Sequence, residues 1–209
     1  MRKLIRKLSD MRGISGFEYR LTDQIADMFK KYCDDVKIDS LGSVIAVKRS
    51  NKPNAPKLMI EAHCDEIGLI VTSITDEGYL TFANVGGVDE RTLPSTEVTV
   101  HGKEDLWGVI GIKPNYLLEQ GKTAKLKELA VDTGLSAEKV KELVAVGDSI
   151  TLAQSVGRLG KKQFSGKSLD DRASVAAIMR VMKNIKDLDI DIDVYAVAAV
   201  QEEVGCRGG

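Results

Sequence analysis

The sequence has few of the residues on which many metal and redox sites depend. Its 209 residues include 2 histidines, His63 and His101, and 3 cysteines, Cys33, Cys64 and Cys206. The cysteines are widely spaced and form no C-x-x-C pair, which excludes a zinc ribbon, a zinc finger and a thioredoxin-type motif. An odd number of cysteines in a chain of this length also argues against a disulfide framework, so we expect reduced thiols.

Excess charge and long apolar runs are lacking as well. Lys+Arg 30 against Asp+Glu 31 gives a net charge of -1, so no basic surplus points to nucleic acid or acidic membranes. No apolar run approaches the roughly 20 residues of a membrane span, and no apolar stretch of a signal peptide follows the basic N-terminus. Aromatic residues make up 5 % and form no stripe for base stacking. We therefore expect a cytoplasmic protein that binds neither nucleic acid nor membrane.

Helical and strand patterns alternate at both ends of the chain. Apolar residues at helical spacing predict a helix from about residue 19 to 32, and Ser15 and Glu18 before it have the S-x-x-E spacing of a capping box. Short strands are predicted at 36–39, 43–47 and 58–60. A second helix is predicted over 171–185. The nearly all-apolar run 194–200 after it is typical of a central strand covered on both faces.

The middle of the chain, from Gly68 to about Gly160, is rich in short strands separated by glycines and polar turns. This pattern is typical of a small barrel or sandwich. One helix, capped by Ser136, interrupts it. The sequence therefore predicts an α/β domain built from residues 1–67 and 164–209, with a β-rich domain inserted at residues 68–163.

A histidine and a carboxylate follow the predicted 58–60 strand. His63 and Asp65 are two residues apart, so both would point to one side of an extended backbone. Ligands collect at the carboxyl ends of strands in open α/β sheets. One ring nitrogen of His63 could bind a metal while Asp65 holds the other. The H-x-D string is short and common, so this motif alone favours a surface histidine in a charged turn over a metal ligand.

Further carboxylates stand at two other element ends. Asp170 precedes the predicted helix 171–185, where ordinary capping competes with a metal-bridging role. Glu202 and Glu203 follow the apolar 194–200 run, and adjacent like charges there are unfavourable unless solvent or a cation relieves them. A solvated loop is the alternative. Together with His63, these groups are the ligand set of a two-metal hydrolase.

Other chemistries have no matching motif. The sequence contains no G-x-S-x-G elbow, no P-loop and no G-x-G-x-x-G string. Cys64 is adjacent to His63, and adjacent side chains on an extended backbone point apart, which argues against a Cys/His nucleophile. His101 lies in the predicted insert, where we expect it to be structural.

The motifs occur in an order that identifies a family. Residues 62–68 (AHCDEIG), 85–89 (VGGVD), 169–172 (LDDR) and 200–208 (VQEEVGCRG) resemble those of the tetrahedral (TET) aminopeptidases of peptidase clan MH. That family includes glutamyl and deblocking aminopeptidases and proteins labelled cellulase M or FrvX. The resemblance covers the chain from end to end. It implies an α/β fold with a phosphorylase/hydrolase-like mixed sheet, helices on both faces, and a small barrel-like insert that serves for dimerisation.

The resemblance also implies an activity and a role for each site residue. The expected activity is binuclear metal-dependent removal of the N-terminal residue from peptides. His63 would bind one metal, Asp170 would bridge both, and Glu203 would bind the second. Asp65 would orient His63, and Glu202 would be the general base. The cofactors would be two divalent metal ions, zinc or cobalt, with manganese also suitable. The expected oligomer is a tetrahedral dodecamer assembled from dimers.

The resemblance implies two further ligands, an aspartate and a histidine, at positions that would follow Gly209. We therefore expect a C-terminally truncated catalytic domain that is inactive alone, with the 194–200 strand left exposed. One alternative is a catalytically incomplete chain that acts only as an oligomerisation module. A weaker alternative, a glycoside hydrolase, rests on the endoglucanase label used within the family, and it gives His63 no role.

Overall fold

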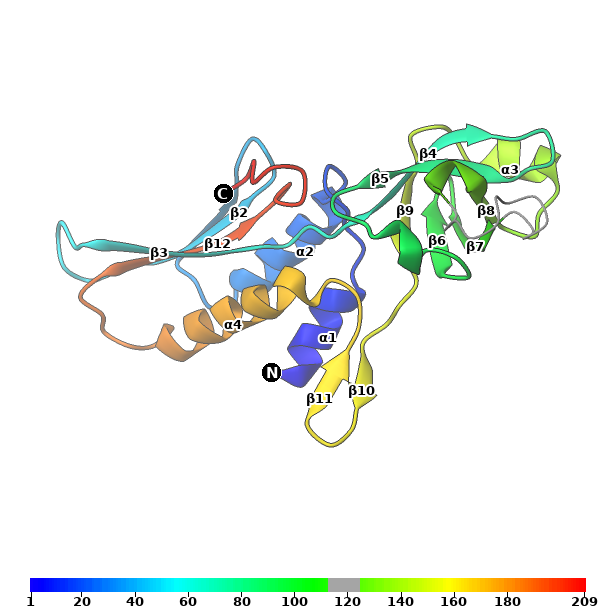
Figure 1. Cartoon of the computed structure of the whole chain (residues 1–209). Helices are drawn as coiled ribbons and strands as arrows, with labels where there is room; N and C mark the ends of the chain where they lie inside the picture. The colour runs from blue at the N-terminus through cyan, green and yellow to red at the C-terminus, as the bar shows by residue number, and fades with distance from the viewer. Residues whose placement is uncertain (113–124) are drawn as a thin grey trace. The chain divides into compact units, whose positions relative to one another are not determined.

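The computed structural model describes residues 1–112 and 125–209, whose contacts form two compact units. The first unit contains residues 1–66 and 155–209, and the second contains residues 67–154 (Figure 1). The sequence-based boundary at 163/164 differs from the second of these junctions. A hairpin of β10 (Gly157–Leu159) and β11 (Gln163–Ser165) groups with the first unit. Residues 113–124 of the predicted insert lie outside the described residues.

A mixed sheet of four strands forms the first unit. Its order is β1-β2-β12-β3, with bounds Asp35–Ile38, Val44–Lys48, Asp193–Ala199 and Lys57–His63. β12 pairs antiparallel with β2 and parallel with β3. The expectation that the strand at 194–200 is left exposed is wrong, because β12 is flanked on both sides. β2 and β3 are its neighbours in the sheet.

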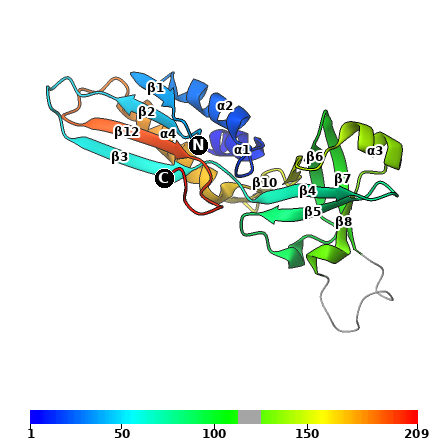
Figure 2. The same cartoon turned by 90° about the horizontal axis from the view of Figure 1, so that it is seen from above.

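Helices α1 (Arg2–Asp10), α2 (Tyr19–Phe29) and α4 (Leu169–Ile185) pack on one face of this sheet (Figures 1 and 2). Alternate residues of β12 supply that face of the core: Val194, Ala196 and Ala198. Small side chains in the central strand let the helices approach closely. In the described residues these helices cover this face only. None of the described helices is long and apolar enough to span a membrane.

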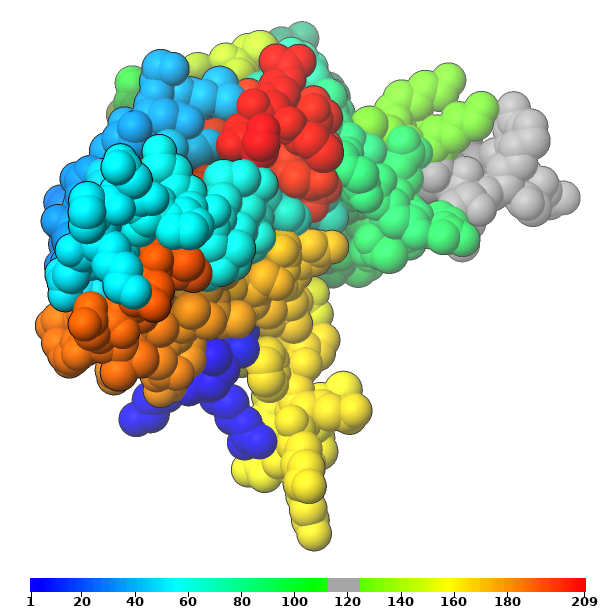
Figure 3. All heavy atoms as spheres, turned by 90° about the vertical axis from the view of Figure 1, so that its left-hand side faces the viewer, coloured from blue at the N-terminus to red at the C-terminus, as the bar shows by residue number. Residues whose placement is uncertain are grey.

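The outer edge of β3 has no partner strand among residues 1–112 and 125–209. Leu58 and Met59 on this strand are 47 % and 62 % exposed. Figure 3 shows the segment around residue 60, in cyan, at the surface. An unpaired edge with exposed apolar side chains is a surface on which another strand can add.

The second unit is a closed barrel with its own apolar core. The strands run in the order β4-β5-β8-β7-β6-β9, with bounds Gly68–Ile74, Leu80–Val85, Leu129–Asp132, Asp105–Ile112, Glu97–His101 and Ser149–Leu152. Helix α3 (Ala137–Leu143) begins after Ser136, whose hydroxyl accepts a hydrogen bond from the Lys139 amide. The predicted barrel and its helix are confirmed.

The predicted capping box before α2 is wrong. The N-cap of α2 is Glu18, which makes no capping hydrogen bond with its side chain. The Ser15 hydroxyl donates to Asp65, and the Glu18 carboxylate accepts from the Gln201 amide. Both polar side chains thus bind residues distant in sequence instead of capping the helix.

Candidate metal centre

Parallel pairing of β3 and β12 brings two of the predicted motifs to one edge of the sheet. His63, the last residue of β3, is in register with Ala199, the last residue of β12. Glu202 and Glu203 follow within the next turn of chain. Since parallel strands end at the same edge, the histidine and the glutamates must meet there.

His63, Glu202 and Glu203 each offer a ligand atom, and these atoms all lie within 4.8 Å of one another. Asp170 at the start of α4 joins them, because its Oδ1 is 3.2 Å from His63 Nε2. Glu202 Oε2 is 3.8 Å from the same nitrogen. The structure thus brings together the four residues that the sequence motifs predicted. One imidazole nitrogen and three carboxylates form a donor set that fits a divalent cation.

Asp65 lies behind this cluster and is fully buried. Its Oδ1 is 3.5 Å from His63 Nδ1, the ring nitrogen that faces away from the cluster. The same carboxylate accepts hydrogen bonds from the Ser15 hydroxyl at 2.5 Å and from the amides of Glu202 and Glu203 at 3.1 and 3.2 Å. One side chain therefore contacts both the histidine and the turn that bears the glutamates. A carboxylate in this position favours the orientation in which Nε2 points to the cluster.

The carboxylates of the cluster outnumber its single imidazole, and this shifts the pKa values of the groups in it. The adjacent Asp65 carboxylate, acting against burial, raises the pKa of His63 to about 9. Burial raises the pKa of Glu203, and the charges of Glu202, Asp65 and Asp170 add to that effect. The accumulated negative charge thus favours the protonated forms of His63 and Glu203. A metal ion would compete with these protons for the same atoms.

A buried basic network, to which the sequence analysis gave no role, adjoins the cluster. Arg172 is fully buried and donates to the carbonyls of Cys64 at 2.7 Å, Leu8 at 3.0 Å and Gly13 at 3.2 Å. The Lys167 ammonium donates to Glu66 at 2.6 Å. These bonds join α1, the end of β3 and the start of α4. The sequence signal for Arg172 is its helical spacing from the apolar stripe, three residues before Val175.

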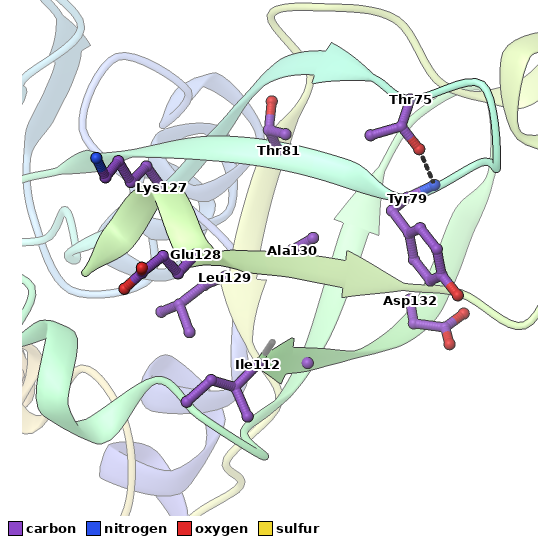
Figure 4. Close-up of a pocket in the computed structure, with 10 residues that line it drawn as sticks. Thr75, Tyr79, Thr81, Ile112, Lys127, Glu128, Leu129, Ala130 and Asp132 are labelled. Carbon is purple, nitrogen blue, oxygen red and sulfur yellow. Dashed lines mark hydrogen bonds between the residues drawn. The ribbon is translucent and has the colours of Figure 1, made fainter. Parts of the chain in front are cut away.

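A pocket of about 510 Å³ lies on the barrel (Figure 4), and none of its lining residues is a predicted site residue. Tyr79, Ile112, Leu129 and Asp132 are among its lining residues. His101 also belongs to the barrel, where its ring nitrogens contact Asp105 at 2.8 Å and Thr151 at 2.9 Å. These bonds agree with the structural role expected for His101.

A profile of the M42 glutamyl aminopeptidase family matches residues 42–209. The lysyl aminopeptidase of Pyrococcus furiosus is 35 % identical over 214 residues, which cover 99 % of this chain and 60 % of that protein. Two solved structures are also similar. The Pyrococcus horikoshii TET1 peptidase, described as assembling into a tetrahedron or an octahedral shell, is 35 % identical with a TM-score of 0.88, over 99 % of this chain and 63 % of the other. A Thermotoga maritima protein named endoglucanase is 33 % identical with a TM-score of 0.80, over 94 % and 58 %.

The sequence therefore spans about 60 % of the length of such relatives. The part that it shares with them includes both units and the residues His63, Asp170, Glu202 and Glu203. On the family profile, the relatives and the shared fold together, this chain belongs to the M42 glutamyl aminopeptidase family.

Proposed function

We propose that the full-length protein is a binuclear metal-dependent aminopeptidase and that this chain supplies His63, Asp170 and Glu203 as metal ligands. The observation that carries the proposal is the convergence of the His63 ring and three carboxylates at the ends of β3 and β12 and the start of α4. Family membership supports the same activity. Zinc, cobalt and manganese all suit this donor set.

The chemistry that such ions supply is activation of water and polarisation of the scissile carbonyl. The chain's own residues do the remaining work. Asp65 lies beside His63 Nδ1 and favours the orientation in which Nε2 points to the cluster. Asp170 would contribute its carboxylate to hold the ions. Glu202 takes a proton from the attacking water on its carboxylate and transfers it to the leaving amine. The surrounding negative charge favours a peptide whose N-terminal ammonium lies at the cluster, which restricts cleavage to the first residue.

We propose in addition that the inserted unit, at residues 68–163 by sequence, is a dimerisation domain. Trp107 on β7 is 58 % exposed, and exposed aromatic side chains are enriched at protein interfaces. The tetrahedral assembly described for the P. horikoshii relative supports a homo-oligomer of the full-length protein. Light scattering of the full-length protein and of its Trp107→Lys variant tests whether the inserted unit mediates dimerisation. An unchanged mass would count against the proposed interface.

The activity is tested with the full-length protein and chromogenic aminoacyl substrates, before and after metal is removed by a chelator. We expect metal-dependent release of the N-terminal residue. Glu202→Gln should abolish turnover while metal content stays the same, because Glu202 acts as the base and not as a ligand. Asp170→Asn should lose metal and turnover together. The proposal fails if the metal-loaded full-length protein cleaves no N-terminal residue.

Two other functions remain testable against this one. The first is that this chain is only an oligomerisation module, since the described residues supply a single histidine to the cluster. Two tightly bound metals per 209-residue chain would contradict it. The second is glycoside hydrolysis, which the name of the T. maritima relative suggests. Release of sugar from β-glucans by the full-length protein would support it.

A further inference from the structure

The segment at residues 13–18, between α1 and α2, runs alongside the residues that follow β3. Ile14 and Glu66 form an isolated parallel bridge. The Glu66 amide donates to the Gly13 carbonyl at 3.0 Å, and the Ser15 amide donates to the Glu66 carbonyl at 3.2 Å. Backbone hydrogen bonds thus attach this segment to Glu66, the residue that follows Asp65. Its position is fixed independently of its side chains.

Ser15 reaches the metal cluster from this segment through one side-chain bond. The residue is 5 % exposed, and its hydroxyl donates to Asp65 Oδ2. Asp65 Oδ2 also accepts from the Glu203 amide. Loss of the hydroxyl would leave a buried carboxylate with one fewer donor, and donors to a buried carboxylate determine how firmly it is held.

Glu18 contacts the turn that precedes Glu202 and Glu203. It is 5 % exposed, and its Oε1 accepts from the Gln201 amide at 3.1 Å. Gln201 has a φ of 57°, in the left-handed region that non-glycine residues rarely adopt. Such a conformation persists when neighbouring groups hold it. The hydrogen bond from Gln201 to Glu18 is therefore placed to hold the turn just before Glu202 and Glu203.

We propose that Ser15 and Glu18 are positioning residues of the metal centre. Ser15 fixes the Asp65 carboxylate, and Glu18 fixes the backbone of Gln201. The two together keep His63, Glu202 and Glu203 in the arrangement that the proposed metal centre requires. The inference rests on the proposed metal centre and deepens it. It also gives a role to the S-x-x-E pair, which caps no helix in this structure.

The test measures the zinc affinity of the 209-residue chain by competition with a chromophoric chelator. We expect Ser15→Ala and Glu18→Ala each to weaken binding about 10- to 100-fold, the range typical of groups that orient metal ligands. Glu18→Gln keeps an acceptor oxygen for the Gln201 amide and should restore most of the affinity. Ser50→Ala is the matched control. It removes a hydroxyl that donates at 2.7 Å to the Ile190 carbonyl, at the opposite end of β12, and should leave affinity within about 2-fold.

A second measurement keeps the inference falsifiable without metal. Amide hydrogen exchange at Gln201, Glu202 and Glu203 in the metal-free chain should accelerate in Ser15→Ala and Glu18→Ala and not in Ser50→Ala. Unchanged exchange and unchanged zinc affinity in both variants would overturn the positioning role, even if the parent chain binds zinc tightly. If the parent chain binds no zinc and amide exchange is faster in the two variants, the positioning role is supported and the metal centre is refuted. Circular dichroism confirms that each variant is folded.

Discussion

The three cysteine thiols differ in how readily they react. Burial raises the pKa of Cys64 to about 12, and burial with the nearby Asp34 charge raises the pKa of Cys33 to about 11. Cys206 is exposed, and its hydrogen bond to Glu202 raises its pKa. Thiolate is the reactive form, so its rate of reaction rises with pH.

We therefore predict that one thiol of the folded chain, Cys206, reacts with a disulfide reagent, and that the rate increases from pH 7 to pH 9. All three thiols should react in guanidinium chloride. The absorbance change after mixing gives the number of thiols that react, and peptide mass spectrometry identifies which cysteines they are. Cys206→Ser should remove the reaction of the folded chain. Prompt labelling of Cys64 without denaturant would contradict the burial described.

Arg172 carries a second residue-scale prediction. Its guanidinium donates to carbonyls in α1, in the segment after α1 and at the end of β3. Lysine has one nitrogen and cannot reach all of them, so buried carbonyls lose a donor. Arg172→Lys should lower the free energy of unfolding by about 3–5 kcal/mol, measured by urea denaturation. Arg180→Lys, on the same helix, is the control and should change it by less than about 0.5 kcal/mol.

Sequence reasoning at this scale found the acidic residues at strand and helix ends but not the residues that hold them. His63, Asp170, Glu202 and Glu203 stand beside strong apolar patterns, which made their meeting predictable, although their roles stay proposals. Ser15 and Glu18 match a local capping pattern equally well. The partners that distinguish the two interpretations, Asp65 and Gln201, are far away in sequence. Local spacing carries no information about them.

Among the elements, strands with a long apolar or alternating pattern were predicted and very short ones were not. The strand predicted at 43–47 is β2 within one residue, and the apolar run at 194–200 is β12 within one residue. β8 was missed, and so were β10 and β11, which have 3 residues each. A period of two cannot be recognised over so few positions. Pairing with neighbours in space defines these strands.

The turn between β4 and β5 provides a prediction for an element. Gly78 has a φ of 93°, and a Cβ there would lie 2.8 Å from the Cα of Ala137. Gly78→Ala should destabilise the barrel by about 1–3 kcal/mol in thermal unfolding, because both the conformation and the contact oppose a side chain. Gly87→Ala is the control, since a Cβ at Gly87 meets no atom within 4 Å. Equal effects of the two substitutions would refute this explanation.

For the whole molecule, the open edge of β3 predicts self-association of the 209-residue chain. Met59→Lys places a charge on that edge, and charged edge residues oppose strand addition. We expect the variant to sediment with a lower weight-average mass at the same concentration. Tyr19→Lys removes an apolar side chain of similar exposure, 63 %, from α2 instead of a strand edge. If both variants associate equally, the edge is not the contact.

The first unit is built from two separate parts of the chain, and this determines the order in which the protein can fold. β12 lies between β2 and β3, yet it is made after residues 67–154, so the sheet cannot close until the barrel has been synthesised. Closing an unstructured loop of that length costs about 4 kcal/mol of chain entropy. The barrel reduces this cost when it folds first, because Leu69 of β4 pairs with Ile150 of β9 and brings the ends of the insert together. A variant that weakens the barrel, such as Gly78→Ala, is then expected to slow refolding of the metal-binding unit, although it touches none of that unit's residues.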